Sequence, residues 1–482
     1  MTEAVEYDVV VLGAGPTGEN VADRTRAAGL STAVVEGELV GGECSYWACM
    51  PSKALLRPVI TRSDARKVPG VRQAVQGPLD TESVLAHRDG MTSHWKDDGQ
   101  VSWLDGTGAR LYRGQGRLHG PRKVVVEGPE GEHHVLTARH AVAVCTGSRA
   151  VLPDLPGLTG ARAWTSREAT SAHAAPGRLV VVGGGVVGAE MATAWQGLGS
   201  QVTLLVRGGL LPRMEPFVGE YVAESLTEAG ATVRTGVVVA AVNRPDPGGP
   251  GTVVLDDGEL IEADEVLFAT GRAPRTGDIG LETVGLEPGS WLRVDDSCRV
   301  DGHDWLYGVG DVNHRALLTH QGKYQARIAG AAIVARARHT PLLETDRWGA
   351  HAATADHDAV PQVVFTDPEA AAVGLSLAEA RAAGHRVRAV DRDLAAVAGA
   401  SLFVDNYRGR ARMVVDLDRE VLLGATFVGP GVSELLHSAT IAVAGEVPID
   451  RLWHAVPSYP TISEVWLRLL EEYRDGQDGQ GG

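Results

Sequence analysis

The stretch "YDVVVLGAGPTGENVADRTRAAGLSTAVVEGE", residues 7–38, decides the fold of the first part of the chain. An apolar run leads into Gly13, Gly15 and Gly18, an alanine-rich segment follows, and a second apolar run ends at Glu36. This order predicts strand, glycine turn, helix and strand, as in a dinucleotide-binding fold. Gly13 permits the tight turn, Gly15 lets the backbone approach a pyrophosphate, and Gly18 allows close helix packing. The helix N-terminus stabilises phosphate charge and Glu36 accepts hydrogen bonds from ribose hydroxyls; the alternative is a glycine turn without a ligand.

The same unit recurs in "GRLVVVGGGVVGAEMATAWQGLGSQVTLLVR", residues 177–207, with Gly183, Gly185 and Gly188 in the same order. Two such folds predict two nucleotides, and electron transfer between them is the simplest explanation. Each half closes at an apolar strand followed by Thr-Gly, in "AVCTGSR" (143–149) and "LFATGRAPR" (267–275). These turns predict that the chain leaves the first dinucleotide-binding fold near residue 150 and the second near residue 275.

Length and charge exclude several classes of protein. A chain of 482 residues predicts roughly three domains of about 100–200 residues each. A net charge of −16 argues against a nucleic-acid-binding protein. The acidic start lacks the basic region of a signal peptide, and no apolar run reaches the ~18 residues that span a bilayer. We therefore expect a cytoplasmic protein, with no membrane partner, in which structural disulfides are rare.

Two of the four cysteines lie in "GGECSYWACMPSK", residues 41–53. They could bind a metal, link the fold covalently or pass electrons. A zinc site needs about four ligands, and neither Cys145 nor Cys298 has a spaced partner, so no metal site is predicted. Because a helix N-terminus stabilises a thiolate, Cys44 and Cys49 at the start of a predicted helix fit a redox pair. Cys145, in an apolar strand, is expected to pack in the core, and Cys298 has no evident role.

These motifs resemble the disulfide-reductase branch of the FAD/pyridine-nucleotide oxidoreductases, which contains lipoamide dehydrogenase, glutathione reductase and mercuric reductase. The resemblance rests on both glycine fingerprints, the C-x4-C-x-P-S-K segment, the strand "WLYGVGDVNH" (305–314) and the "PTISE" near the C-terminus. It covers the chain from Tyr7 to about Tyr473. It implies an α/β fold with two Rossmann-like domains plus an α+β C-terminal dimerisation domain.

The resemblance also implies domain bounds and roles. Residues 1–150 and 276–348 bind FAD, 151–275 bind the nicotinamide nucleotide and 349–473 form the dimer interface; we expect the polar tail 474–482 to be disordered. Cys49 lies against the flavin as a charge-transfer thiolate, and Cys44 is the outer sulfur that attacks the substrate. Lys53 pairs with Glu190 beside the flavin, and Asp311 holds the ribityl chain; their alternatives are a solvated lysine and a simple turn. The further cofactor-binding residues implied are Gly42, Thr146, Gly147, Gly271 and Gly310.

The chain departs from this family in two places. Tyr46 and Trp47 lie between the cysteines, where relatives carry small or aliphatic residues; they pack in the core, narrow the pocket or stack on a flat acceptor. Relatives that reduce ordinary dithiols end in His-Pro-Thr-x-x-Glu, with the histidine contributed by the other subunit of a homodimer. Here Glu464 remains, but Tyr459 occupies the histidine position, and a phenol is a poor base at neutral pH. His454 is the local substitute, unless it is only a surface histidine.

The second fingerprint predicts NADPH, with NADH as the alternative. NAD-using relatives end the second strand with Glu, but Val206 stands here, followed by Arg207 and Arg213. Two guanidiniums without the carboxylate suit a 2′-phosphate, as in the glutathione-reductase pattern. The alternative is that both arginines are ordinary surface charges.

Three functions follow as hypotheses. The first is an FAD enzyme that takes hydride from NADPH and passes electrons through Cys44 and Cys49 to a small acceptor. The second is an NAD(P)H:quinone reductase in which the flavin reduces the acceptor directly, which the loss of the histidine favours. The third, a non-catalytic subunit, is opposed by the intact fingerprints and cysteine pair.

Overall fold

The computed structural model describes residues 4–246 and 248–478. Within them, the contacts divide the chain into two compact units. Unit 1 comprises Met1–Pro51, Asp89–Val151 and Gly271–His357, and unit 2 comprises Ser52–Arg88, Leu152–Thr270 and Asp358–Gly482. None of the described helices is long and apolar enough to cross a bilayer.

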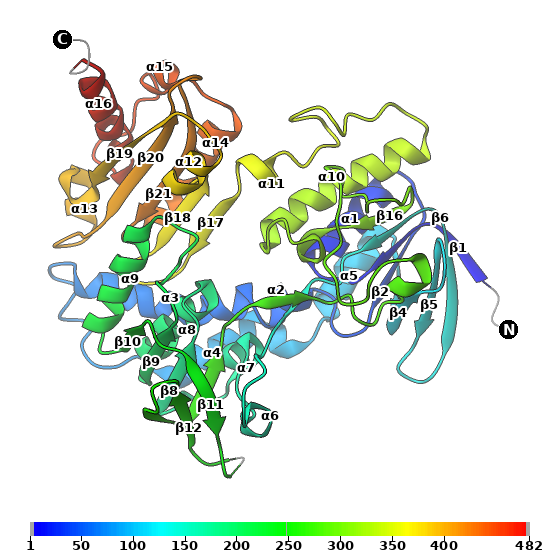
Figure 1. The fold of residues 1–482 in the computed structure, drawn as a ribbon, viewed down its shortest axis with the longest axis horizontal. Helices are drawn as coiled ribbons and strands as arrows, with labels where there is room; N and C mark the ends of the chain where they lie inside the picture. The colour runs from blue at the N-terminus through cyan, green and yellow to red at the C-terminus, as the bar shows by residue number, and fades with distance from the viewer. Residues whose placement is uncertain (1–3, 247, 479–482) are drawn as a thin grey trace. The chain divides into compact units, whose positions relative to one another are not determined.

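Unit 1 is built on a seven-stranded sheet in the order β3-β2-β1-β6-β5-β4, with β16 paired to β6 (Figure 1). Its strands are β1 (Ala4–Leu12), β2 (Thr32–Glu36), β3 (Arg110–Arg113), β4 (Gln115–Leu118), β5 (Lys123–Glu127), β6 (His133–Val144) and β16 (Leu306–Gly308). β1, β2, β3, β6 and β16 are parallel, whereas β4, β5 and β6 meander antiparallel. The apolar run that ends β1 is fully buried, as expected for a central parallel strand.

Two long helices of unit 1 pack against each other: α1 (Pro16–Ala27) and α10 (Thr319–Ala337). The short helix α2 (Gly42–Tyr46) follows β2, and α5 (Asp98–Thr107) packs on α1. The strand-turn-helix-strand order predicted for residues 7–38 is therefore confirmed.

Unit 2 holds the second parallel sheet, in the order β10-β9-β8-β14. Its strands are β8 (Arg178–Val182), β9 (Gln201–Val206), β10 (Thr232–Thr235) and β14 (Glu265–Phe268), with α8 (Val186–Gly197) and α9 (Pro216–Glu228) as connecting helices. A three-stranded antiparallel sheet follows, made of β11 (Val239–Asn243), β12 (Gly251–Leu255) and β13 (Leu260–Ala263). The predicted second glycine-turn fold is confirmed.

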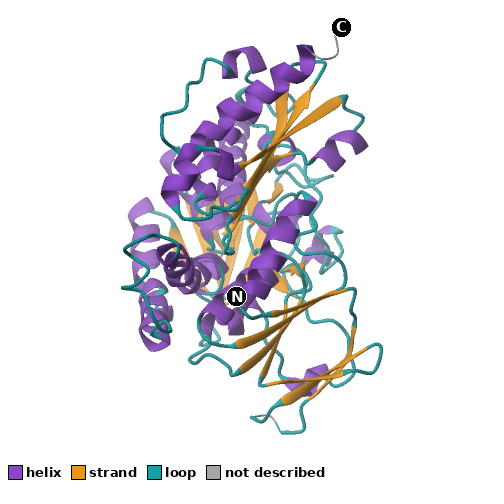
Figure 2. Cartoon of the chain, turned by 90° about the vertical axis from the view of Figure 1, so that its left-hand side faces the viewer, coloured by secondary structure: helices purple, strands orange, loops and turns teal. Residues whose placement is uncertain are grey.

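The C-terminal part of unit 2 is a five-stranded antiparallel sheet with helices beside it (Figure 2). Its strands, in sheet order, are β17 (Pro361–Val364), β18 (Ala370–Gly374), β21 (Val421–Val428), β20 (Arg410–Asp416) and β19 (Val387–Asp393). The helices include α12 (Leu377–Ala382), α13 (Ala398–Phe403), α14 (Leu436–Ala444), α15 (Ile449–Leu452) and α16 (Val465–Asp478). This arrangement confirms the predicted α+β C-terminal domain.

The prediction that the tail from residue 474 is disordered is wrong for its first part, because α16 continues to Asp478. The Arg388 guanidinium donates hydrogen bonds to the carbonyl oxygens of Tyr473 at 3.0 Å and Glu472 at 3.2 Å, which anchors the helix. Tyr473 is fully buried. Tertiary contacts thus outweigh the low helix propensity of the glycine-rich sequence. Residues 479–482 lie outside the described residues.

Candidate active site

The first glycine turn is shaped by close backbone approach. Gly13 has a φ of +96°, and a Cβ added there would lie 2.5 Å from the Cys145 carbonyl oxygen. A Cβ on Gly18 would lie 1.9 Å from the Gly13 oxygen, so no other residue fits. At Gly15 the nearest atom, the Gly42 Cα, is 3.9 Å away. Backbone packing therefore requires glycine at positions 13 and 18. At Gly15, the start of α1 has no close neighbour among the described residues.

Glu36, at the end of β2, is tied to this turn. Its carboxylate accepts hydrogen bonds from the amides of Ala14 at 2.7 Å and Glu38 at 2.8 Å. Burial raises the Glu36 pKa, although both amide bonds oppose the shift. These two bonds hold the Glu36 carboxylate, which we expect to bind a ribose, beside the glycine turn.

The second turn repeats this geometry in unit 2. Gly183 has a φ of +123°, and a Cβ on Gly188 would lie 1.9 Å from its oxygen. No atom lies within 4 Å of a Cβ added at Gly185 among the described residues. Val206 is buried at the end of β9, and the following Arg207 and Arg213 are both exposed. The two guanidiniums are therefore accessible to a ligand at this end of the sheet.

The cysteine pair lies where two helices begin. Cys44 is in α2, Cys49 is the first residue of α3 (Cys49–Arg66), and the Cys49 sulfur is 3.2 Å from the hydroxyl of Thr319, the first residue of α10. The pKa of the Cys44 thiol is raised, first by its hydrogen bond to Cys49 and then by burial. Thr319 and the positive charge of Lys323 oppose this shift. The raised pKa follows from the pairing, because two adjacent sulfurs do not ionise together.

The aromatic residues between the cysteines have different surroundings. Tyr46 is buried, its hydroxyl donates to the Val40 carbonyl at 3.0 Å, and its pKa is raised to about 12 mainly by burial. Trp47 is half-buried and meets the Tyr46 ring edge to face, with centroids 5.7 Å apart. Of the alternatives considered, core packing is the one that Tyr46 adopts.

Lys53 and Glu190 form the predicted ion pair in unit 2. The Lys53 Nζ lies 2.8 Å from Glu190 Oε2 and 3.2 Å from Oε1, and only the glutamate is buried. Glu190 also accepts a hydrogen bond from the Phe365 amide at 3.0 Å, and Lys53 Nζ lies 5.0 Å from the centre of the Phe365 ring. Lys53 follows Cys49 by four residues in α3, so chain continuity links the pair to the redox segment.

Asp311 belongs to a polar chain that sequence reasoning did not find. Ser148 donates a hydrogen bond to Asp311 at 2.5 Å and accepts one from Arg272 at 2.7 Å. Burial raises the Asp311 pKa. Nearby in sequence, the buried hydroxyl of Thr146 has no hydrogen-bond partner within the described residues. Gly147, Gly271 and Gly310 adopt positive φ angles at these turns, as does Gly42 at the start of α2.

Sequence reasoning did not find three residues of this site, because no local pattern marks them: Ser148, Arg272 and Thr319. The Thr-Gly turns pointed to residues 146, 147 and 271, but not to the bonds that cross between them. Pairing of β7 (Ser148–Ala150) with β15 (Arg272–Pro274) brings Ser148 to Arg272. Such contacts are long-range and depend on the folded topology.

The C-terminal motif differs from the expected acid–base arrangement. Tyr459 is 75% exposed, and His454 is also exposed. Glu464 is buried, and its Oε1 accepts a hydrogen bond from Arg468 at 2.6 Å. Its Oε2 is buried without a hydrogen-bond partner in the described part of the chain. One carboxylate oxygen therefore remains available to orient a group.

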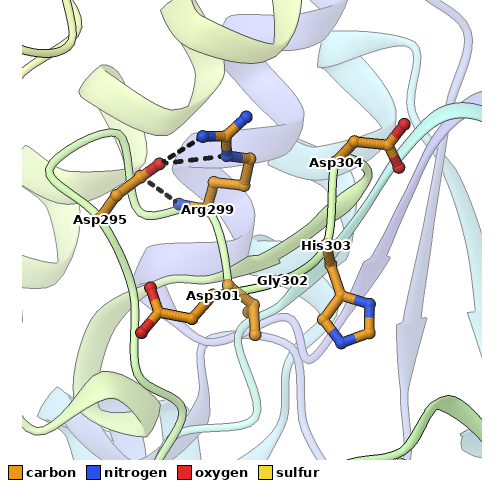
Figure 3. A pocket seen from close by; sticks show the side chains of 7 residues that line it. Asp295, Arg299, Asp301, Gly302, His303 and Asp304 are labelled. Atoms are coloured by element: carbon orange, nitrogen blue, oxygen red, sulfur yellow. Dashed lines mark hydrogen bonds and ion pairs between the residues drawn. The ribbon is translucent and has the colours of Figure 1, made fainter.

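A surface pocket lined by residues 295 and 299–304 does not form a further reactive site (Figure 3). Asp295 accepts hydrogen bonds from the Arg299 side chain at 3.1 Å and from its amide at 3.0 Å. The side chains of Asp301, His303 and Asp304 point in different directions. Across residues 4–246 and 248–478, no group of three or more His, Cys, Asp or Glu could hold a metal ion.

Comparison with known proteins identifies relatives along nearly the whole chain. Residues 7–332 match the family described as pyridine nucleotide-disulphide oxidoreductase, and residues 360–469 match its dimerisation domain. A dihydrolipoyl dehydrogenase from Thermus scotoductus is 30% identical, covering 96% of this chain and 97% of the relative. A mercuric reductase from Staphylococcus aureus is 29% identical, covering 95% and 81%. The crystal structure of LpdA from Mycobacterium tuberculosis shares the fold, with a TM-score of 0.82, 24% identity and coverage of 97% and 99%.

Proposed function

Since this chain belongs to the pyridine nucleotide-disulphide oxidoreductase family, we propose that it takes hydride from NADPH and reduces a small acceptor through Cys44 and Cys49. As a member of this family, the protein is an FAD-dependent oxidoreductase that uses a pyridine nucleotide and a redox-active disulfide. Its dimerisation domain indicates a homodimer. We assign residues 1–150 and 276–348 to FAD binding, 151–275 to NADPH binding and 349–473 to the dimer interface.

The observation that carries the proposal is the cysteine pair at the helix starts. The 3.2 Å contact between the Cys49 sulfur and Thr319 lies at the positive end of α10, where a thiolate is favoured. We assign Cys44, whose pKa is raised by its hydrogen bond to Cys49 and by burial, as the outer sulfur that attacks the substrate. In this assignment Cys49 faces the flavin and Cys44 faces the acceptor.

The residues around the first turn fit FAD. The uncrowded Gly15, the amide-bonded Glu36, the unpartnered Thr146 hydroxyl and the Ser148–Asp311 chain offer donors and acceptors for a pyrophosphate, riboses and a polyol. FAD bound there would supply the chemistry that couples hydride acceptance from a nicotinamide to two-electron reduction of the disulfide. The Lys53–Glu190 pair keeps a buried carboxylate neutralised, and we assign it to positioning the flavin-facing part of α3.

Counting thiols tests this function directly. Anaerobic NADPH should make two thiols per subunit reactive toward a thiol reagent in the folded protein, and mass mapping should place both labels on Cys44 and Cys49. Cys145 and Cys298 are buried and should stay unlabelled. If NADPH reduces the flavin and no thiol becomes reactive, the disulfide route is refuted.

The cofactor preference rests on Arg207 and Arg213, and it should be reversed by a charge change. Because a hydrogen bond to a charged group is worth about 1.5–3 kcal/mol, NADPH should be preferred to NADH by about ten- to a hundredfold in kcat/KM. Arg207→Glu should erase or invert this ratio, since the new carboxylate repels a 2′-phosphate and accepts a 2′-hydroxyl. Arg451→Glu, at an exposed site on α15, is the control. Equal use of both cofactors by the wild type would overturn the assignment.

A second candidate, an NAD(P)H:quinone reductase, is favoured by one observation. The residue in the family's histidine position is the exposed Tyr459, and phenols are in general poor bases at neutral pH. A quinone takes its protons from solvent and needs no thiol chemistry. Comparing quinone and disulfide reduction in the same preparation separates the two.

A further inference from the structure

The short backbone segment that carries Asp311 is bound to one side chain of α10, that of Gln325. The segment is the 3-10 helix η3 (Gly310–Asn313). The Gly310 amide donates a hydrogen bond to Gln325 Oε1 at 2.7 Å, and the Asn313 side-chain amide donates to the same oxygen at 2.7 Å. Gln325 is fully buried and Asn313 is buried. A single acceptor oxygen therefore holds both ends of the segment around Asp311.

A carboxylate sets the direction of the Gln325 amide. Gln325 Nε2 donates to Asp356 Oδ2 at 2.8 Å, and Gln321 Nε2 donates to Oδ1 at 2.9 Å. Asp356 is buried in α11 (Ala355–Asp358). Burial raises the Asp356 pKa to about 6, and the charge of Arg315 and both glutamine donors oppose the shift. Because an ionised carboxylate only accepts hydrogen bonds, it keeps the Gln325 nitrogen toward Asp356 and leaves the Gln325 oxygen for Gly310.

The position of Asp311 depends on this segment. Its carboxylate accepts a hydrogen bond from Ser148 at 2.5 Å, and its backbone nitrogen follows directly after Gly310. Gly310 has a φ of +82°, and a Cβ added there would lie 2.8 Å from the Thr17 hydroxyl of α1. The segment is thus confined by packing against α1 and by hydrogen bonds to α10. A loop already held in its binding conformation pays less ordering cost when a ligand binds.

We propose that Gln325 is a positioning residue for FAD: its amide oxygen keeps the Asp311 carboxylate in place for the FAD polyol, and Asp356 keeps the amide in the required orientation. This inference rests on the proposed role of Asp311 in FAD binding. Without Gln325, the buried Gly310 amide has lost its acceptor, so the segment relaxes toward water. FAD binding must then reverse that relaxation.

Two buried glutamines of one helix provide the test. Gln325→Met removes the acceptor of the Gly310 amide, whereas Gln321→Met removes the other donor to Asp356 and leaves that amide bonded. FAD affinity is measured on the full-length holoenzyme by ultrafiltration and absorbance of the released flavin, together with the unfolding temperature of each variant. Gln325→Met should weaken FAD binding about tenfold or more, since a buried donor is left unsatisfied. Gln321→Met should bind FAD as the wild type does.

Same-sized substitutions test the inference even if Gln325→Met folds poorly. Gln325→Glu keeps an oxygen at the Gly310 amide and shares one proton with Asp356, because two adjacent buried carboxyls do not both ionise. It should bind FAD more tightly than Gln325→Met. Asp356→Asn should release FAD faster than the wild type, since its amide nitrogen cannot accept from a glutamine donor. Wild-type affinity in Asp356→Asn would refute the orienting role of that carboxylate.

The outcomes separate positioning from general stability. Equal FAD loss in both methionine variants, in proportion to their lowered unfolding temperatures, would overturn the inference, and so would wild-type affinity in Gln325→Met. Asp311→Ala tests the premise: if it binds FAD as tightly as the wild type, the role of Asp311 and the inference both fail. If Asp311→Ala loses FAD and Gln325→Met does not, the positioning role alone is refuted. FAD release requires neither NADPH nor the cysteines, so this result is independent of the thiol count.

Discussion

Cys49→Ser is expected to eliminate disulfide reduction while FAD stays bound. Turnover of disulfide substrates should fall by on the order of 10³-fold or more, because the substitution removes the covalent route and not one supporting interaction. Anaerobic two-electron reduction of the wild type should produce a long-wavelength absorption band, which reports a thiolate against oxidised flavin. Cys49→Ser should lack that band, since its hydroxyl does not ionise.

Cys44→Ser is the matched control for this prediction. It also loses disulfide turnover, but it keeps the Cys49 sulfur beside Thr319 and should show the band without any reduction. The pair of variants therefore assigns the inner and outer sulfurs separately. A wild-type protein that bleaches directly to fully reduced flavin, with no band at any stage, would refute the assignment of Cys49.

Tyr459→His is expected to raise disulfide turnover by about 10²-fold or more, the usual range for general acid–base help. An imidazole in general exchanges protons at neutral pH far more readily than a phenol does. We expect Glu464 to orient the new ring, as the His-Pro-Thr-x-x-Glu pattern implies, because its Oε2 is buried without a partner among the described residues while its Oε1 is bonded to Arg468. In the wild type, NADPH-driven reduction of a quinone should exceed that of lipoamide or glutathione disulfide.

Three controls sharpen this result. Tyr459→Phe should leave the low disulfide activity unchanged if the phenol carries no proton. Tyr459→His combined with Glu464→Gln should lose part of the gain, since the ring is then less well oriented. His454→Ala tests the local substitute, and a collapse of native disulfide turnover would identify His454 as the base. Robust wild-type disulfide turnover, insensitive to all these changes, would show that the tyrosine is misinterpreted.

Part of the candidate site was predictable because its signals are local. The glycine fingerprints depend on backbone clashes within a few residues, such as the 1.9 Å approach of a Gly18 Cβ to the Gly13 oxygen. The Lys53–Glu190 pair was predicted only through the family resemblance, and the structure shows it at 2.8 Å. The Ser148–Asp311 contact joins residues 163 positions apart, and no local pattern encodes it. Residues 474–478 were predicted to be disordered, but they continue α16. Arg388, from β19, donates hydrogen bonds to the two carbonyl oxygens just before them, and no local pattern encodes this contact.

The sequence by itself determined the two strand-turn-helix-strand units, the cysteine pair and the replacement of histidine by Tyr459. Spacing and side-chain chemistry are sufficient for these, because strands, glycine turns and helix starts follow from short-range sterics and periodicity. Only the tertiary structure decided that Glu19 is buried, that Thr319 contacts Cys49 and that the pKa of the Cys44 thiol is raised by its hydrogen bond to Cys49 and by burial. Burial and electrostatic coupling depend on which distant helix packs alongside, and here α10 packs closely against α1.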